Sequence, residues 1–453
     1  MRLHIGTWVL REVALTLQCQ VNFMFDMKHI KRFLMLALVP MMAEAQTLTL
    51  EQCQEQAREN YPVIKRYDLI QQTTDFTVEN IQKGWLPQIS ALAQATYQSD
   101  VATLPSPLQN MLGQYGYDVK GLKKDQYRIA IDVNQTVWDG GLMKRQKEIA
   151  RLQGDVQTAQ ADVDMYAIRQ RVNDLYFGVL LLDEKIRLNG ELQSMLQSNL
   201  DKLSSMLKNG VAMKSDVNTV KAEKLRAEQQ ATELQTTRQS LVRVLSEFCG
   251  KEVSAVMKPN VLYSMSNGQS NNRPELSLFD KQISLAEAQE GKLKSKLMPR
   301  FSVFAQGYYG YPGYDMFHDM FHHTWSLNGM VGARVVWNID GVYRNKSDRA
   351  KLQTQRNLIE TGRETFLFNN RLMEVQQTEG VEKYRRLMQE DDAIVNLRSE
   401  VRQSAESKLQ HGIIDTNNLL QEITRENQAR IDRQTHEVQM LKEMYDLKYT
   451  TNN

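Results

Sequence analysis

The chain has 453 residues, of which 42% are hydrophobic and 24% are charged. This composition is typical of a folded protein and excludes a largely disordered chain. Glycine (23 residues) and proline (9 residues) are few for this length, which favours long, uninterrupted elements. The formal net charge is only +2, so the chain offers no broad positive field for a nucleic acid.

The N-terminal residues predict an export signal. A basic stretch follows Met27, an apolar run extends over 33–42, and Ala43-Glu44-Ala45 has the small–x–small pattern of a signal-peptidase site. We therefore expect residues 1–45 to be an upstream extension and a signal peptide, with the mature chain starting near residue 46. After Gln46 the sequence has no long apolar segment, so any membrane crossing in that part would need strands.

The cysteines and acidic runs indicate no catalytic or metal site. Cys53 and Cys249 can pair in an oxidising compartment, but two inert thiols are the favoured interpretation. The run Glu390-Asp391-Asp392 has no His or Ser neighbour in sequence, which favours a solvated helix face. Because we find no nucleophile–base set, phosphate loop or metal motif, we expect no enzymatic activity, no cofactor and no metal.

The clearest signal is an internal repeat. Three sequence blocks recur in the same order at offsets of about 200–212 residues: a Leu-Pro or Met-Pro stop before a strand, a Trp-containing strand end, and a Gly-containing turn. Each half therefore predicts a helix, two strands, a long helix, a turn and a returning helix. The predicted divisions are residues 46–249 for the first repeat, 250–272 for an irregular equatorial linker, and 273–453 for the second repeat.

Four segments alternate apolar and polar residues as strands do, near 88–99, 126–138, 300–311 and 324–337. Each is long enough for a tilted bilayer crossing. The strands are followed by Pro-free segments near 142–208 and 342–409 with apolar residues at alternating spacings of three and four, which is a coiled-coil pattern. At 1.5 Å per residue, about 65 helical residues extend roughly 100 Å. Shorter helices are expected near 49–86, 216–249, 274–298 and 415–449.

Four strands cannot close a barrel around a lumen, so the strands of several protomers must form one shared barrel. The duplicated plan, the Trp138-Asp139-Gly140-Gly141 turn with its partner at Trp337 and Gly341, and the segments at Gly210 and Gly412 resemble the TolC-like outer-membrane efflux proteins. The resemblance implies a mainly α protein with a membrane β-barrel part, that is, a homotrimer with a 12-stranded barrel in outer-membrane lipid and an α-helical periplasmic tunnel. It also implies a periplasmic membrane-fusion adaptor and an inner-membrane transporter as partners.

The resemblance places adaptor docking at the two turns at the periplasmic tip. The matching positions are Asn209, Gly210, Val211, Ser215 and Asp216 in the first turn and His411, Gly412 and Ile413 in the second. Glycine permits such a turn, and Ser215 or Asp216 can cap the returning helix. Some family members have acidic residues six and nine positions after the second glycine. This chain has Asn418 and Gln421 there, which leaves Asp415 as a candidate carboxylate at the constriction.

The expected function is the outer-membrane channel of a tripartite efflux or secretion system, which conducts substrates passively. The alternative is a periplasmic coiled-coil adaptor or scaffold, which would explain the heptads and the signal peptide but not the two strand pairs. A charged residue placed at Ala93 or Ile129 distinguishes the two hypotheses, because a barrel would lose outer-membrane assembly and a scaffold would tolerate the change.

Overall fold

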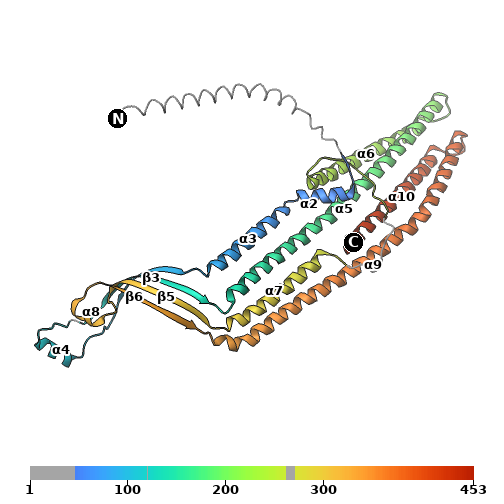
Figure 1. Cartoon of the computed structure of the whole chain (residues 1–453). Helices are drawn as coiled ribbons and strands as arrows, with labels where there is room; N and C mark the ends of the chain where they lie inside the picture. Colours follow the sequence, from blue (N-terminus) through green and yellow to red (C-terminus); the bar gives the residue numbers. More distant parts are fainter. Residues whose placement is uncertain (1–45, 120, 262–270, 453) are drawn as a thin grey trace, which may run out of the picture.

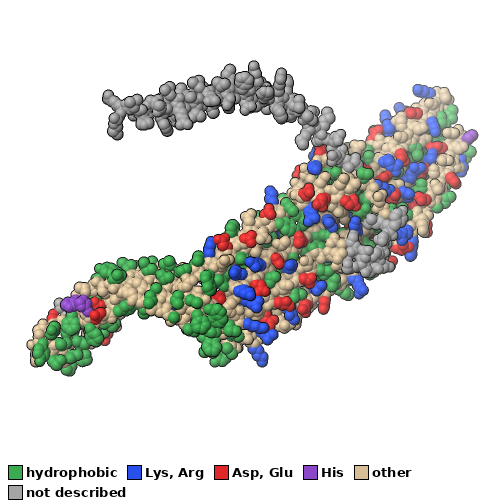
Figure 2. Space-filling model, in the orientation of Figure 1, with side chains coloured by type: hydrophobic (Ala, Val, Ile, Leu, Met, Phe, Trp, Pro, Cys, Tyr) green, Lys and Arg blue, Asp and Glu red, His purple; other side chains and the backbone are tan. Residues whose placement is uncertain are grey.

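The computed structural model describes residues 46–119, 121–261 and 271–452. The expected signal peptide at residues 1–45 lies outside this range. The molecule is elongated, with a sheet of four strands towards one end and a group of long helices that reaches the other end (Figure 1). Hydrophobic side chains gather over the sheet, whereas Lys, Arg, Asp and Glu side chains gather over the helices (Figure 2).

Two very long helices run most of the length of the helical part. They are α5 (Leu142–Lys208) and α9 (Asp340–Gln410), and each turns back into a shorter helix, α6 (Lys214–Cys249) and α10 (Thr416–Thr451) respectively. Helix α7 (Pro274–Lys296) packs against both α5 and α9. No helix in the described ranges combines the length and the apolar character that a membrane crossing needs.

The first helical segment differs from the single helix expected near 49–86. It consists of α2 (Leu50–Asn60), which Thr49 caps, and α3 (Ile64–Lys83), with a break at Tyr61-Pro62-Val63. Pro62 explains the break, because proline has no backbone N–H to donate and its ring clashes with the preceding turn. The expected stop before Pro87 is present, since α3 ends at Lys83.

The sheet has the strand order β2-β3-β5-β6 and is antiparallel throughout. Its strands are β2 (Gln88–Tyr97), β3 (Asp125–Trp138), β5 (Arg300–Tyr311) and β6 (Ser326–Val336). The register aligns Ala93 with Ile129, Ile129 with Tyr309, and Tyr309 with Leu327. Because side chains alternate along a strand, the odd-numbered residues of the four strands share one face and the even-numbered residues share the other. The exception is the end of β3, where the register shifts between Thr136 and Trp138 and Trp138 pairs with Phe301.

The two loops at the far end of the sheet pack together. They contain two short helices that the sequence did not predict, α4 (Ser106–Gln114) and α8 (Met316–His322). Leu122, Tyr311 and Met320 form a small buried cluster there. The Tyr311 hydroxyl accepts a hydrogen bond from the backbone N–H of Lys123, at 2.9 Å, which ties one loop to the start of the other.

At mid-height, a second, parallel pair of strands joins β1 (Gln46–Leu48) to β4 (Val253–Val256). Residues 250–272, expected to be irregular, therefore contain a strand. The largest core cluster lies beside this pair and joins α2, α5, α6 and α10. Cys53 and Cys249 are buried in it as free thiols. Their mutual hydrogen bond, together with burial, raises the pKa of Cys53, which keeps this thiol protonated and unreactive.

Candidate functional site

The two helical hairpins end in turns of the same geometry. After α5, the N–H of Val211 donates to the Met206 carbonyl at 2.9 Å and the N–H of Gly210 donates to the Leu207 carbonyl at 3.0 Å. After α9, Ile413 and Gly412 repeat this pattern at 2.9 and 3.0 Å. This is a Schellman C-cap, which requires a residue in the left-handed region. Gly210 has φ +74° and Gly412 has φ +70°.

The returning helices begin with carboxylate caps. Met213 is the N-cap residue of α6, and its N–H donates to the carboxylate of Asp216, in the first turn of the helix, at 2.9 Å; Ser215 does not occupy the cap position. Asp415 is the N-cap of α10, and its carboxylate accepts from the Asn418 N–H at 2.8 Å. One oxygen of Asp415 is therefore engaged at the helix end. Asn418 and Gln421 are exposed on the first turns of α10.

Each tip exposes an aliphatic side chain above a buried core. Val211 and Ile413 are 70% and 69% exposed, although both are large hydrophobic residues. Below them, a cluster that includes Leu203, Val220 and Leu419 joins the two hairpins. Each tip therefore has an exposed apolar residue and is held in place by the buried cluster below it. The predicted docking residues of each turn lie close to one another. Asn209 and His411 occupy the C-cap positions of α5 and α9.

A buried ion network lies further along α10. The Glu426 side chain is only 1% exposed and accepts hydrogen bonds from Arg402 of α9, at 2.6 Å, and from Arg430, at 2.7 Å. Arg430 also contacts Glu191 of α5 at 3.4 Å. Burial disfavours the charged form of Glu426, but the two guanidinium groups outweigh it and hold the pKa of this carboxyl below its usual range. The network couples the two hairpins.

The acidic run at residues 390–392 is solvated only in part, because Glu390 and Asp392 are exposed and Asp391 is not. Asp391 is buried, and its carboxylate lies 2.7 Å from the Nδ1 atom of His436 on α10. Asp392 pairs with Arg433 at 3.1 Å. The partners lie more than 40 residues away and meet only because α9 and α10 pack side by side, so local sequence gives no signal for them.

The two strand-to-helix turns differ in detail. Asp139 accepts hydrogen bonds from the N–H groups of Gly141 (2.9 Å) and Met143 (2.6 Å), which starts α5. Gly140 has φ +71°, and a Cβ there would lie 2.5 Å from Met298. In the second turn, Trp337 donates its indole N–H to the Leu297 carbonyl at 3.0 Å, while Gly341 lies inside the first turn of α9. Gly341 therefore does not have the role of Gly140.

The two faces of the sheet have opposite chemistry. The face with the odd-numbered residues, here termed the apolar face, includes Ile89, Ile129, Val303, Leu327 and Val331, of which Leu327 and Val331 are 82% and 83% exposed. Soluble proteins rarely expose such a continuous apolar surface. The face with the even-numbered residues, here termed the polar face, includes Gln94, Arg128, Asp132, Gln306 and Arg334.

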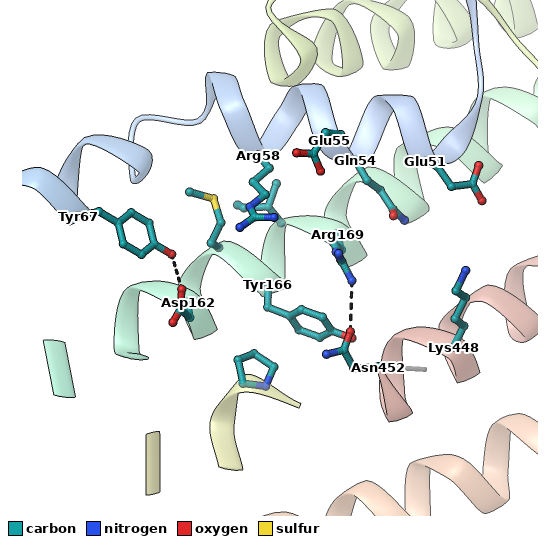
Figure 3. Close-up of a pocket in the computed structure, with 13 residues that line it drawn as sticks. Glu51, Gln54, Glu55, Arg58, Tyr67, Asp162, Tyr166, Arg169, Lys448 and Asn452 are labelled. Atoms are coloured by element: carbon teal, nitrogen blue, oxygen red, sulfur yellow. Dashed lines mark hydrogen bonds between the residues drawn. The ribbon is translucent and has the colours of Figure 1, made fainter. Parts of the chain in front are cut away.

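A cavity of about 510 Å³ lies at mid-height, and no sequence pattern predicts it (Figure 3). Helices α2, α3, α5 and α10 contribute to its lining. Tyr67 donates its hydroxyl to Asp162 at 2.7 Å, and burial together with this carboxylate raises the pKa of Tyr67 to about 12. Around it, cationic side chains are balanced by carboxylates; these are Arg58, Arg169, Lys448, Glu51, Glu55 and Asp162. Because the charges cancel, the lining favours no single class of ligand.

Comparisons with known proteins identify the fold. A scan against protein-family models finds no match, and a search of curated proteins finds none. Among solved structures, the outer-membrane protein VceC of Vibrio cholerae aligns over 89% of this chain and 96% of its own, with a TM-score of 0.65 and 12% identity. The CmeC outer-membrane channel of Campylobacter jejuni aligns over 89% and 85%, with a TM-score of 0.64 and 9% identity.

The MtrE outer-membrane channel of Neisseria gonorrhoeae is similar to the same degree. It aligns over 89% of both chains, with a TM-score of 0.63 and 11% identity. In each case almost the whole length is shared, while the identity is too low to carry residue roles. The chain therefore has the fold of the TolC-like outer-membrane channels, which confirms the resemblance that its sequence motifs predict.

Proposed function

We propose that this chain is the outer-membrane channel of a tripartite efflux or secretion system. The observation that carries the proposal is the sheet, whose apolar face is exposed to its surroundings while its polar face holds the charged side chains. Exposure of such an apolar surface to water is unfavourable for a soluble scaffold, whereas outer-membrane lipid would cover the surface. The shared fold with outer-membrane channels supports the same function.

Closure of the channel requires further copies of the chain. Within the described residues, the outer edges of β2 and β6 have no strand partner. Unpaired backbone groups are costly in lipid, so each edge must meet the opposite edge of a neighbouring copy. Three copies give twelve strands, which is a size that leaves a lumen. We infer a homotrimer with a shared barrel and a helical tunnel extending into the periplasm.

The helical end provides the docking surface in this proposal. Val211 and Ile413 are exposed on the two turns, above the core that joins the hairpins. An apolar groove between the helices of a periplasmic membrane-fusion adaptor would bury them, and an inner-membrane transporter would supply the energy for export. Conduction through the chain itself is passive, and opening occurs by small sliding of the helix pairs at the tips.

The function is tested by a pair of arginine substitutions in neighbouring residues of β2. Ala93→Arg places a charge on the apolar face, which costs about 2–4 kcal/mol near the bilayer midplane. Gln94→Arg places the same charge on the polar face and serves as the matched control. We expect the Ala93→Arg protein to be lost from the outer-membrane fraction and the Gln94→Arg protein to assemble. Equal assembly of both variants would contradict a lipid-facing sheet.

A further inference from the structure

The charged side chains of the sheet are sorted almost entirely onto one face. Arg128, Asp132, Arg300 and Arg334 are all even-numbered and belong to the polar face by their register. The remaining charged residue of the four strands, Asp125, is the first residue of β3 and lies at the end of the sheet. The polar face therefore carries three guanidinium groups and one carboxylate, a net charge of +2 per chain.

The three guanidinium groups are not neutralised by carboxylates. Among the described residues, none of them has an ion pair, and Asp132 instead accepts a hydrogen bond from Gln306. The Arg128 guanidinium lies 4.2 Å from the ring centre of Tyr308, and that of Arg334 lies 4.8 Å from the ring centre of Phe304. The Nε atom of Arg128 is buried without a hydrogen-bond partner in this part of the chain.

The stacking has a consequence for ligand binding. An aromatic ring supports the flat face of a guanidinium and leaves its N–H groups along the edge free to donate. Oxyanions such as carboxylate, sulfate and phosphate are the ligands that match these donors. The single carboxylate is too far along β3 to compete, since Arg128 and Asp132 are four residues apart, or about 13 Å in a strand.

We propose that the polar face selects anions, so that the barrel part of the channel passes anionic solutes in preference to cations. This inference rests on the proposed function, because the polar face lines the lumen only if the apolar face meets lipid. In a trimer the face would carry a net charge of +6. A lumen lined by one sign of charge concentrates the counter-ion and excludes ions of the same sign.

The test is the reversal potential of the purified full-length protein in a planar bilayer under a potassium chloride gradient. The wild-type channel has a reversal potential of the sign expected for chloride preference. The double variant Arg128→Gln/Arg334→Gln lowers the chloride-to-potassium permeability ratio by roughly twofold or more, because two of the three positive charges are removed. The effect is strongest at low salt, since at 1 M salt the Debye length is only about 3 Å.

Two matched controls test whether the charge of these side chains determines the chloride preference. Asp132→Asn removes the negative charge and raises the chloride preference, while Arg128→Lys/Arg334→Lys keeps the charge and leaves the permeability ratio close to the wild-type value. A conducting channel that prefers potassium, or one whose ratio is unchanged in the double glutamine variant, overturns the inference and leaves the proposed function standing. Recovery of the wild-type chain only from the soluble periplasm would instead overturn the proposed function.

Discussion

Single glycines determine the geometry of both tips. A Cβ at Gly210 or Gly412 would meet no atom of the described residues within 4 Å, so only the positive φ requires glycine there. Gly210→Ala and Gly412→Ala each cost about 1–2 kcal/mol, because an L-residue is strained in the left-handed region. Amide hydrogen exchange at residues 205–216 and 407–418 should quicken accordingly.

Gly190 provides the matched control for these substitutions. It lies exposed inside α5, also without an atom near its missing Cβ. Gly190→Ala should stabilise α5 by about 0.5–1 kcal/mol, because alanine is the better helix former. If Gly210→Ala and Gly412→Ala also stabilise the protein, the left-handed conformation at the tips does not require glycine.

Glu426 has the least exposed carboxylate among the ion pairs of the described residues. Glu426→Gln leaves Arg402 and Arg430 without their carboxylate and should cost about 3–5 kcal/mol of unfolding free energy. Glu79→Gln, in an exposed pair with Lys83, should cost less than about 1 kcal/mol. Thermal unfolding of both variants beside the wild-type protein measures the difference.

The same carboxylate predicts a pH dependence. Since the pKa of Glu426 is lowered by folding, its contribution is complete above the unfolded pKa of about 4.3 and is lost as the pH falls through the folded value. The wild-type protein should therefore lose more stability than Glu426→Gln on acidification below that range. If both proteins lost the same amount of stability on acidification, the pKa of Glu426 would not be lowered by folding.

At the scale of elements, Arg273 links the start of α7 to the interior of α5 and to the end of α10. Its guanidinium lies 4.8 Å from the Tyr166 ring centre on α5 and 4.6 Å from that of Tyr449 on α10, and it also pairs with Glu275. Lysine keeps the charge but not the planar stack, so Arg273→Lys should cost about 1–2 kcal/mol. The exposed Arg371→Lys is the control and should leave the unfolding temperature unchanged.

The elements also show what the sequence could and could not predict. The span of α5 follows from a Pro-free segment with coiled-coil spacing, and the strands follow from strict alternation, because both signals are local. The break between α2 and α3 also has a local signal, Pro62, although a single helix is expected near 49–86. The pairing of β1 with β4 joins segments about 200 residues apart, and the contacts of Asp391 and Glu426 depend on how α5, α9 and α10 pack. Such long-range pairings leave no periodic signal.

At the scale of the whole molecule, the sheet and the helical part require different surroundings. Within the part of the chain that the structure describes, the sheet presents an apolar face and two unpaired edges, whereas the helical part presents charged side chains along its length (Figure 2). One medium does not suit both parts. A chain that places the sheet in lipid and the helices in water, and that closes its edges with identical copies, satisfies all of these demands together.

The most direct test of this account is the mass of the particle extracted from the outer-membrane fraction with a mild detergent. We predict a particle of three chains, because three four-stranded sheets give a barrel of twelve strands, which is wide enough to leave a lumen. A monomer in that fraction would contradict the shared barrel. Recovery of the chain only from the soluble periplasm would contradict the channel itself and would leave the coiled-coil scaffold as the better explanation.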